Sequence, residues 1–586
     1  MGRKLTGKTT SNRAKILQKN GDYYVYEREY RYNPETKKTE RVANKLVAKI
    51  PKGLSVEVPT RKKKRNHESD DPNVQKNEAD NTVITASRQH TGLTDILDYA
   101  GKASGIDEAL MVSTDEDTAK KIISIARFLV ATSGDTLPHI ETWQLTHPIP
   151  YDRGITQDIY YKLCRDIGIN ETLRQRFFAE RCKRLGDCPL IAFDSTTQST
   201  YSEGQIEARY GFNKDGDGLR TIKLLTLYSL EDRQPIAFAK QPGNLPDVTS
   251  LSNTLQQMEV LGLRGAELVT DNGYYSETNL AEMCYQTFHF ITLVKTQLAW
   301  VRKEIDAHRE EMVSIANRKS DLGNVYCFTT AVKRTFTRER KYANRKTGME
   351  KGARIEFDRR LYLHIYFSPE RKEKEDSAFY DRVDEVKELL ENGTAVESLS
   401  TSGQAIAKKY LKTSRRKGRF TCDYQVAVCQ EACKYHGFFA LISNHEKDRF
   451  LALRKYRKRE KIEEYFQSAK EDAGANRPRV WYSDHLMGRL LIQFVALSYE
   501  DFLRYKIAKI KENLGKENGN PGHDKKAQIN QENNLKKWLQ STSFSNVLRW
   551  FDAYETTEVS STVFNRRWNS ETTKRDRLFL NLLGVT

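Results

Sequence analysis

The sequence predicts an α/β fold built around a mixed sheet, in which an antiparallel section is followed by a parallel continuation. The main observation lies between residues 186 and 299, where short apolar runs of strand type alternate with amphipathic stretches of helical periodicity. Their order is three strands, helix, strand, helix, strand, which is typical of an α/β sheet with a hairpin on one side. A second observation is that two of these strand-like runs end in an acid, Asp194 and Asp271.

The N-terminal part is predicted to contain a β-hairpin region at residues 1–50. Between residues 22 and 50, apolar and aromatic residues alternate with charged ones on both sides of a turn at Asn33-Pro34. Residues 51–90 form a basic and polar linker. Its basic block, Arg61-Lys-Lys-Lys-Arg65, either follows DNA phosphates or is simply solvated.

Residues 91–185 have helical periodicity, which is clear in the apolar stripe of residues 119–130. We assign this region to the binding of DNA ends from its position and charge, because no helix-turn-helix spacing stands out in it. The sequence therefore leaves open which N-terminal elements contact DNA.

The predicted core is interrupted once. Its first part, residues 186–299, is followed by basic clusters, short β-like runs and an acidic helix, which indicate a mostly β insertion domain at 300–430. Sheet-like sequence resumes at 437–443, so the second part of the core is placed at 431–510. Residues 511–586 are expected to form a C-terminal helical region.

The composition favours a nucleic-acid partner and a cytoplasmic location. A chain of 586 residues should contain several domains, since single cores rarely exceed about 250–300 residues. Its 97 Lys and Arg against 79 Asp and Glu give a net charge of +18, which favours a polyanionic partner, nucleic acid first and an anionic membrane surface second. A generic basic surface is the plainer alternative. We expect no membrane span and no secretory signal, because the sequence has no sufficiently long apolar run.

The eight cysteines are too sparse for a disulfide scaffold and indicate a reducing compartment. Four residues, Cys429, Cys433, His436 and His445, raise the question of zinc. Their spacing fits no standard finger, and the two cysteines lie in an apolar segment. We therefore expect buried thiols.

A stripe of four residues follows the second sheet-like segment. If residues 456–470 form one helix, Tyr456, Arg459, Glu463 and Lys470 lie on one face, because positions seven apart drift by only about 20°. The neighbouring side is apolar and can pack on a core. Glu464 points about 100° away, so geometry favours Glu463 as a ligand.

The three acids together indicate a metal site. Carboxylates at the ends of two strands, joined by one from a nearby helix, suit Mg²⁺, which prefers oxygen ligands. Two such ions about 3.5–4 Å apart activate the attacking oxygen and stabilise the leaving oxygen in phosphoryl transfer. Either Asp194 or Asp271 alone is more simply explained as a turn residue or helix cap.

The combination resembles the DDE transposases of bacterial insertion sequences, which have a ribonuclease-H-like core. More narrowly, it resembles the IS-four supergroup, whose signature Tyr-x2-Arg-x3-Glu-x6-Lys is complete at Tyr456, Arg459, Glu463 and Lys470. The segments Phe193-Asp-Ser-Thr and Thr270-Asp-Asn-Gly-Tyr-Tyr-Ser are similar to the motifs around the two other acids. The resemblance covers about residues 186–505.

The resemblance implies a metal-dependent enzyme that cleaves DNA at the ends of an insertion sequence and joins them to a target by a cut-and-paste route. Asp194, Asp271 and Glu463 would be the catalytic residues and the ligands of two Mg²⁺ ions, for which Mn²⁺ can substitute. Lys470 and Arg459 would hold phosphates near the scissile bond.

The partners implied are double-stranded DNA, as terminal inverted repeats and as target, and a second copy of the chain on paired ends. The enzyme would act in the bacterial cytoplasm, at the nucleoid. Tyr456 would position the terminal DNA by a phosphate hydrogen bond or by stacking. Cleavage through hairpin ends would need an aromatic to stack on a flipped base. Trp300 is the candidate, with a core or surface tryptophan as the plainer interpretation.

Further cations are candidates for contacts with the DNA backbone. Arg454, Lys455, Arg457 and Lys458 lie directly before the proposed ligand Glu463, where DNA contact is favoured over a solvated charge run. Lys214 contacts either phosphate or solvent. Two other functions stay open: a transposase-derived DNA-binding protein without catalysis, and a ribonuclease-H-like nuclease that cuts without joining.

Overall fold

The computed structural model divides into two compact units, Met1–Val83 and Ile84–Thr586, which are described separately. The structure describes residues 10–19, 21–33, 38–50, 52, 58–59, 85–211, 213, 216–263, 265–339, 350–416, 419–471, 480–515, 523–561 and 564–585.

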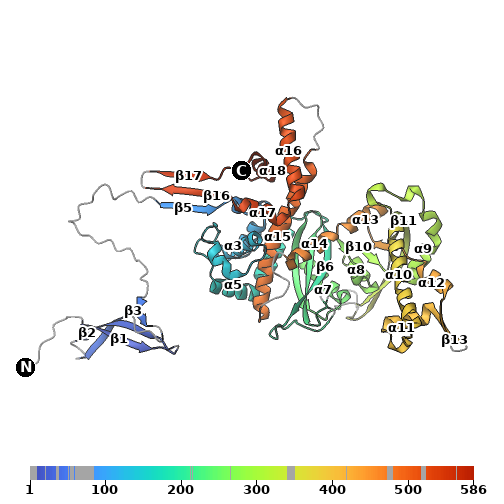
Figure 1. Ribbon diagram of the computed structural model, residues 1–586, viewed down its shortest axis with the longest axis horizontal. Helices are drawn as coiled ribbons and strands as arrows, with labels where there is room; N and C mark the ends of the chain where they lie inside the picture. The colour runs from blue at the N-terminus through green and yellow to red at the C-terminus, as the bar shows by residue number, and fades with distance from the viewer. Residues whose placement is uncertain are drawn as a thin grey trace, which may run out of the picture. The chain divides into compact units, whose positions relative to one another are not determined.

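The first unit is an antiparallel sheet with the order β1-β2-β3-β4 (Figure 1). Its strands are β1 Thr10–Leu17, β2 Tyr23–Asn33, β3 Lys38–Ile50 and β4 Val58–Pro59. The predicted hairpin is present as β2 and β3, and β1 adds a strand to it. Val25, Ala48 and Ile50 are buried together and identify the inner face of the sheet.

The second unit begins with a strand and a helical region. These elements are β5 Thr85–His90, α1 Gly92–Ser104, α2 Ile106–Ser113, α3 Glu116–Thr132, η2 Leu137–His139, α4 Ile140–Trp143, α5 Gln157–Ile169 and α6 Glu171–Cys182. Helices α3 and α5 pack on the long helix α15 (Ser483–Asn513), which is buried along most of its length. At Gly168 and Gly488 a Cβ atom would lie 1.8 Å and 1.9 Å from backbone oxygens across the α5–α15 contact, so these glycines permit the close approach.

The core of the second unit is an eight-stranded mixed sheet with the order β11-β12-β15-β10-β9-β6-β7-β8. The strands are β6 Leu190–Thr200, β7 Arg220–Ser229, β8 Gln234–Pro242, β9 Glu267–Thr270, β10 His289–Val294, β11 Tyr326–Glu339, β12 Arg354–Phe367 and β15 Phe438–Ser443. Strands β6, β7 and β8 are antiparallel, whereas β6, β9 and β10 are parallel. This arrangement confirms the predicted ribonuclease-H-like mixed sheet.

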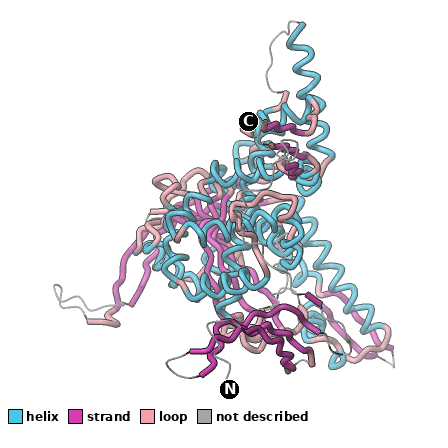
Figure 2. Tube along the Cα trace, turned by 90° about the vertical axis from the view of Figure 1, so that its left-hand side faces the viewer, coloured by secondary structure: helices cyan, strands magenta, loops and turns pink. Residues whose placement is uncertain are grey.

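Helices cover both faces of this sheet (Figures 1 and 2). On one face Ala192 and Val269 pack with Ile462 and Phe466 of α14 (Glu460–Glu471). Residues of opposite parity, such as Phe193, pack towards α7 (Asp247–Val260), η3 (Asn272–Tyr274) and α8 (Glu277–Tyr285). The alternation of two apolar faces explains why the strands read as continuous apolar runs.

The segment at 300–430 is mixed rather than mostly β. It contains α9 Ala299–Met312, η4 Ile315–Asn317, η5 Ser320–Leu322, α10 Pro369–Glu391, η6 Val396–Ser398, α11 Thr401–Tyr410, β13 Leu411–Arg416, β14 Arg419–Tyr424 and α12 Val426–Cys433. Its strands β11 and β12 extend the core sheet by pairing through β15. The insertion is thus continuous with the core through backbone hydrogen bonds.

The sequence had predicted a helical C-terminal region, but the structure also contains strands there. Besides α16 His523–Ser541, α17 Phe544–Asp552 and α18 Lys574–Leu583, it contains β16 Glu555–Ser560 and β17 Asn565–Asn569. These strands form a sheet of order β17-β16-β5. Both strands are short, β16 is mostly half-buried and β17 is exposed, and neither has the apolar alternation that would have revealed it.

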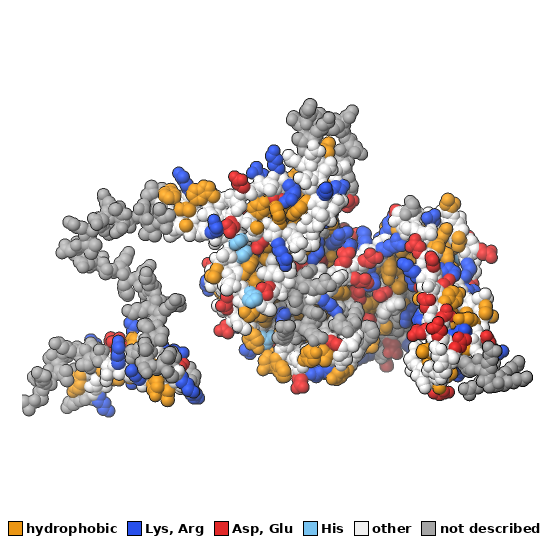
Figure 3. Space-filling view, viewed as in Figure 1, with side chains coloured by type: hydrophobic (Ala, Val, Ile, Leu, Met, Phe, Trp, Pro, Cys, Tyr) orange, Lys and Arg blue, Asp and Glu red, His pale blue; other side chains and the backbone are white. Residues whose placement is uncertain are grey.

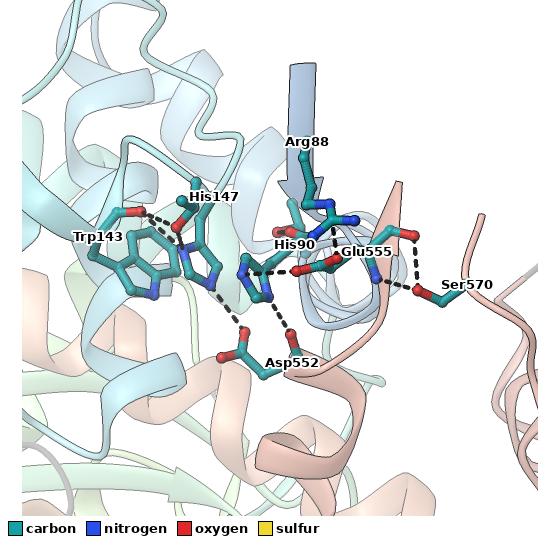
Figure 4. Close-up of polar contacts among 9 residues, drawn as sticks. Arg88, His90, Trp143, His147, Asp552, Glu555 and Ser570 are labelled. Atoms are coloured by element: carbon teal, nitrogen blue, oxygen red, sulfur yellow. Dashed lines mark hydrogen bonds and ion pairs between the residues drawn. The ribbon is translucent and has the colours of Figure 1, made fainter. Parts of the chain in front are cut away.

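Two stacked histidines hold this sheet against the helical region (Figure 4). The rings of His90 and His147 lie 4.7 Å apart, and Trp143 stacks on His147 at 4.2 Å. Asp552 contacts both histidines, through its backbone oxygen to His90 Nδ1 at 2.7 Å and its carboxylate to His147 Nε2 at 3.2 Å. Glu555 pairs with Arg88 at 3.2 Å, next to this stack.

Among the described residues no helix is long and apolar enough to cross a membrane.

Candidate active site

Asp194 lies on β6, and Asp271 directly follows the neighbouring parallel strand β9. Phe193 of β6 pairs with Thr270 of β9, and β9 ends there, so the two aspartates follow together. Asp271 caps η3 and accepts a hydrogen bond from the backbone N–H of Asn272 at 2.7 Å. The prediction that the first strand ends at Asp194 was wrong, because β6 continues to Thr200 through its pairing with β7.

The four residues of the stripe do not lie on one continuous helix. Tyr456 belongs to α13 (Arg449–Arg457), whereas Glu463 and Lys470 belong to α14. Arg459 lies in the turn between them, where its N–H donates to the Tyr456 carbonyl and its own carbonyl accepts from Ile462 N–H, each at 3.0 Å. These i to i+3 contacts tighten the chain and break the helix. The predicted apolar side is confirmed, since Ile462 is fully buried.

Arg459 contacts all three carboxylates. Its Nη1 donates to Asp194 Oδ2 at 2.9 Å, and its Nη2 lies 2.6 Å from Glu463 Oε1 and 3.8 Å from Asp271 Oδ2. The turn between α13 and α14 therefore places one guanidinium at the point where the three acids converge. A single cation can satisfy the whole carboxylate cluster from this point.

The electrostatics of the site follow from this convergence. Burial by itself lowers the pKa of Arg459, but Tyr456 and the three carboxylates outweigh it, so the pKa is raised. Burial, assisted by the nearby Asp271, also raises the pKa of Tyr456. The Tyr456 hydroxyl therefore stays protonated and donates to Asp271 Oδ1 at 3.4 Å.

A fourth carboxylate supports the site from its far side. Asp247, at the first position of α7, accepts a hydrogen bond from Ser195 Oγ at 2.9 Å and pairs with Lys223 Nζ at 2.8 Å. A Cβ at Gly273 would lie 3.4 Å from Asp247 Oδ2, so this carboxylate adjoins the turn after Asp271. From the sequence alone, a loop or helix-cap role for Asp247 is favoured over a supporting role at the site. The segment Gly243-Asn-Leu-Pro-Asp247 was the available signal.

The other predicted contact residues have varied surroundings. Arg454 forms an ion pair with Asp321, and Arg457 donates to the Leu322 carbonyl at 3.0 Å. Lys458 is exposed. In the space-filling view, Lys and Arg side chains gather around α13 (Figure 3).

Two lysines of the signature region contact protein groups. Lys455 pairs with Glu267 at 2.7 Å and with Glu446 at 2.9 Å, which gives it a structural role in addition to the predicted one. Lys470 is partly buried and lines a small cavity together with Thr196 of β6. It therefore lies on the same side of β6 as Asp194, since the two strand positions have the same parity.

Trp300 lies at the start of α9, where the Arg334 guanidinium is 4.7 Å from its ring centroid. It is partly buried against the core. Lys214 lies outside the described residues.

The chain matches a known family over its core. The model of the transposase DDE domain family matches residues 186–499. No curated protein matches the chain. Six chains of solved structures match. One is the cryo-EM structure of the piggyBac transposase synaptic complex with hairpin DNA, at 11% identity and a TM-score of 0.33, covering 84% of this chain and 82% of that chain. Since the family match covers more than half of the sequence, this chain belongs to the transposase DDE domain family and is a DDE transposase.

Proposed function

We propose that this transposase belongs to the IS-four supergroup of bacterial insertion sequences and that Asp194, Asp271 and Glu463 hold its divalent ions. The observation that carries this proposal is the convergence of the three carboxylates on one guanidinium. The Arg459 guanidinium lies among the three carboxylates, where we propose that metal binds. These oxygen donors suit Mg²⁺, with Mn²⁺ as a substitute.

The bound ions would activate the attacking oxygen and stabilise the leaving oxygen of a phosphoryl transfer. The chain itself supplies the alignment of the ligands. Asp194 is held by β6, and Asp271 is oriented by the N–H of Asn272. Glu463 is fixed by the packing of Ile462 on the sheet. Because the ligands stand on rigid elements, little reorganisation is needed when DNA arrives.

Arg459, Tyr456 and Lys470 form the DNA side of the site. Arg459 keeps the three carboxylates together, and it would contact the scissile phosphate when Asp194, Asp271 and Glu463 hold the ions. The protonated Tyr456 hydroxyl donates to a neighbouring phosphate, and Lys470, at the far end of α14, holds the next one. Arg454, Arg457 and Lys458 extend this cationic surface along α13 and its end.

The substrates proposed are the terminal inverted repeats of the element and a target duplex, in the bacterial cytoplasm. Cutting and joining two ends requires two active sites, so the working form is a homodimer on paired ends. Trp300, whose ring centroid lies 4.7 Å from the Arg334 guanidinium, is the proposed aromatic for holding a flipped base of a hairpin end.

The test uses full-length protein and duplexes that carry the terminal repeats found in the DNA flanking the gene. Wild type with Mg²⁺ or Mn²⁺ should cleave at the repeat end and join the end to a target plasmid. Asp271→Ala and Glu463→Ala should bind the duplex without cutting. Glu464→Ala is the matched control, because Glu464 is 62% exposed on the same helix and pairs only with Lys461 among the contacts described.

Two results would contradict the proposal. Binding by wild type without cleavage in either metal would identify a DNA-binding protein that has lost catalysis. Cleavage without joining would identify a nuclease.

A further inference from the structure

One face of the sheet in the first unit carries a regular arrangement of side chains. Residues paired across antiparallel strands point to the same side of a sheet. Val25 is fully buried on one face, so residues of opposite parity on β2 lie on the other face, where Tyr24, Tyr26, Arg28 and Tyr30 are half-buried. We name this other face the tyrosine face. It comprises Tyr24, Tyr26, Arg28, Tyr30 and Tyr32 of β2, Asn12 of β1, and Arg41, Asn44 and Lys49 of β3.

The strand carboxylates that the structure describes in this unit are confined to one face, whereas cations lie on both. The face opposite the tyrosines also carries Arg13, Lys15, Arg31, Lys38 and Lys45. The strand carboxylates that the structure describes in this unit, Glu27, Glu29 and Glu40, all lie on the side opposite the tyrosine face. The tyrosine face carries Arg28 and Arg41 together with Lys49, whose ammonium lies 5.9 Å from the Tyr24 ring centroid and pairs with Asp22 at its edge. A cationic and aromatic surface without strand carboxylates is complementary to a polyanion.

The centre of this face contains side chains suited to base edges. Arg28 pairs in register with Asn12 on one side and Asn44 on the other, so three strands place Asn, Arg and Asn in one row. Asn12 and Asn44 are exposed and Arg28 is half-buried, with its Nε donating to Asn44 Oδ1 at 3.4 Å. Arginine recognises guanine and asparagine recognises adenine by paired hydrogen bonds in the major groove.

The tyrosines flank this row and suit the DNA backbone. Tyr24 and Tyr26 lie on one side of Arg28, and Tyr30 and Tyr32 lie on the other. Hydroxyl and cationic groups that flank a base-reading row can hold the phosphates on each side of the groove. The tyrosine stripe from Tyr24 to Tyr32 covers eight residue steps, about 26 Å at about 3.3 Å per step, which is most of one DNA turn of about 34 Å.

We propose that the tyrosine face docks into the major groove of duplex DNA and reads the terminal repeats, with Arg28, Asn12 and Asn44 contacting base edges. This inference rests on the proposed transposase function, because the repeats are its specific ligand. It assigns end recognition to the β-sheet of the first unit rather than to the helical region at 91–185. β-sheets that enter a groove are an established way for proteins to read DNA.

The test measures binding by the full-length protein in EDTA, so that cleavage does not contribute. Fluorescence anisotropy compares a terminal-repeat duplex with a scrambled duplex of equal length. Arg28→Ala should weaken binding to the repeat about 5- to 150-fold, the range for one bidentate base contact, and should weaken scrambled binding much less. Arg28→Lys keeps the charge and should lose most of the discrimination while retaining scrambled binding.

Arg31→Ala is the matched control. Arg31 lies on the same strand but on the opposite face, in register with Glu40, so its removal should change repeat binding less than twofold. Asn44→Ala offers a second readout that removes no charge and should also reduce discrimination. Thermal unfolding of each variant verifies that the first unit is folded.

Unchanged discrimination in folded Arg28→Ala and Asn44→Ala would overturn the proposal. An equal loss in Arg31→Ala would do the same, since it would show an effect of net charge alone. A tyrosine face that binds another protein would leave DNA binding intact in all of these variants. Failure of the transposase function is distinguished separately, because it would abolish cleavage by wild type without changing these binding ratios.

Discussion

Removal of the Arg459 guanidinium should destabilise the protein, and divalent metal should restore much of the lost free energy of unfolding. Arg459→Ala leaves Asp194, which is 14% exposed, without the partner that lies 2.9 Å away. Breaking a fully buried ion pair costs about 3–5 kcal/mol, and the residual exposure here reduces this to about 2–4 kcal/mol. Glu463 is 55% exposed, so its contact adds only about 0.3–0.5 kcal/mol.

Mg²⁺ should restore much of this loss, because the ion takes the position of the guanidinium among the carboxylates. At a concentration of 100 Kd, a ligand specific for the folded state adds about 2.7 kcal/mol. Wild type should gain less, since the ion must compete with Arg459 for the same oxygens. Mg²⁺ should therefore stabilise the variant more than it stabilises wild type.

The assay is urea unfolding followed by tryptophan fluorescence, in EDTA and in Mg²⁺. Arg457→Ala is the matched control, because Arg457 donates to the Leu322 carbonyl and contacts none of the three acids in the contacts described. Its loss should be about 1 kcal/mol and equal in both buffers. If the deficit of Arg459→Ala were also the same in EDTA and Mg²⁺, the reasoning that a metal replaces the guanidinium would be refuted.

Three further outcomes are expected. Glu463→Gln should lower the cleavage rate at least about a hundredfold, which exceeds the usual loss when a residue that only hydrogen-bonds to a metal ligand is replaced. The control Glu464→Gln should stay within twofold of the wild-type rate. Equal losses in a gel-based cleavage assay would argue against Glu463 as a ligand. Ile462→Ala should lower the free energy of unfolding by about 2–4 kcal/mol in urea titrations, because Ile462 is fully buried between α14 and the sheet. A loss below about 1 kcal/mol would mean that this packing is not tight. Burial lowers the pKa of His364 to about 4, so the folded state binds a proton at His364 less readily than the unfolded state. The contribution of His364 to the free energy of unfolding should be constant above about pH 6.5 and should fall by about 2–3 kcal/mol between pH 6.5 and pH 4. This fall should be absent in His364→Asn.

Sequence reasoning recovered the elements whose patterns are local. The apolar runs of the core predicted the mixed sheet, and the acids Asp194 and Asp271 after two of these runs come together, although Asp194 lies within β6 rather than at its end. The β2–β3 hairpin was equally clear from its alternation. In each of these cases the residue pattern and the secondary structure have the same period.

The features that sequence reasoning missed depend on contacts between distant segments. The helix breaks at Arg459, whose guanidinium contacts Asp194 and Asp271, both of which lie far away in the sequence. No residue near Arg459 in the sequence indicates this break. Asp247 acquires its place only when Ser195 and Lys223 meet it from β6 and β7. Strand β16 pairs with β5, which lies more than 450 residues earlier in the chain, and β17 pairs with β16.

The continuous sheet that joins the core to the insertion has a consequence for truncation. Strands β11 and β12 cover the outer edge of β15, which in turn pairs with β10, the neighbour of β9, and Asp271 directly follows β9. A shortened chain without β11 and β12 would present the apolar strand Phe438–Ser443 with a row of unpaired N–H and C=O groups. Such an edge favours intermolecular strand addition, so the truncated enzyme should aggregate even though its three catalytic acids are intact.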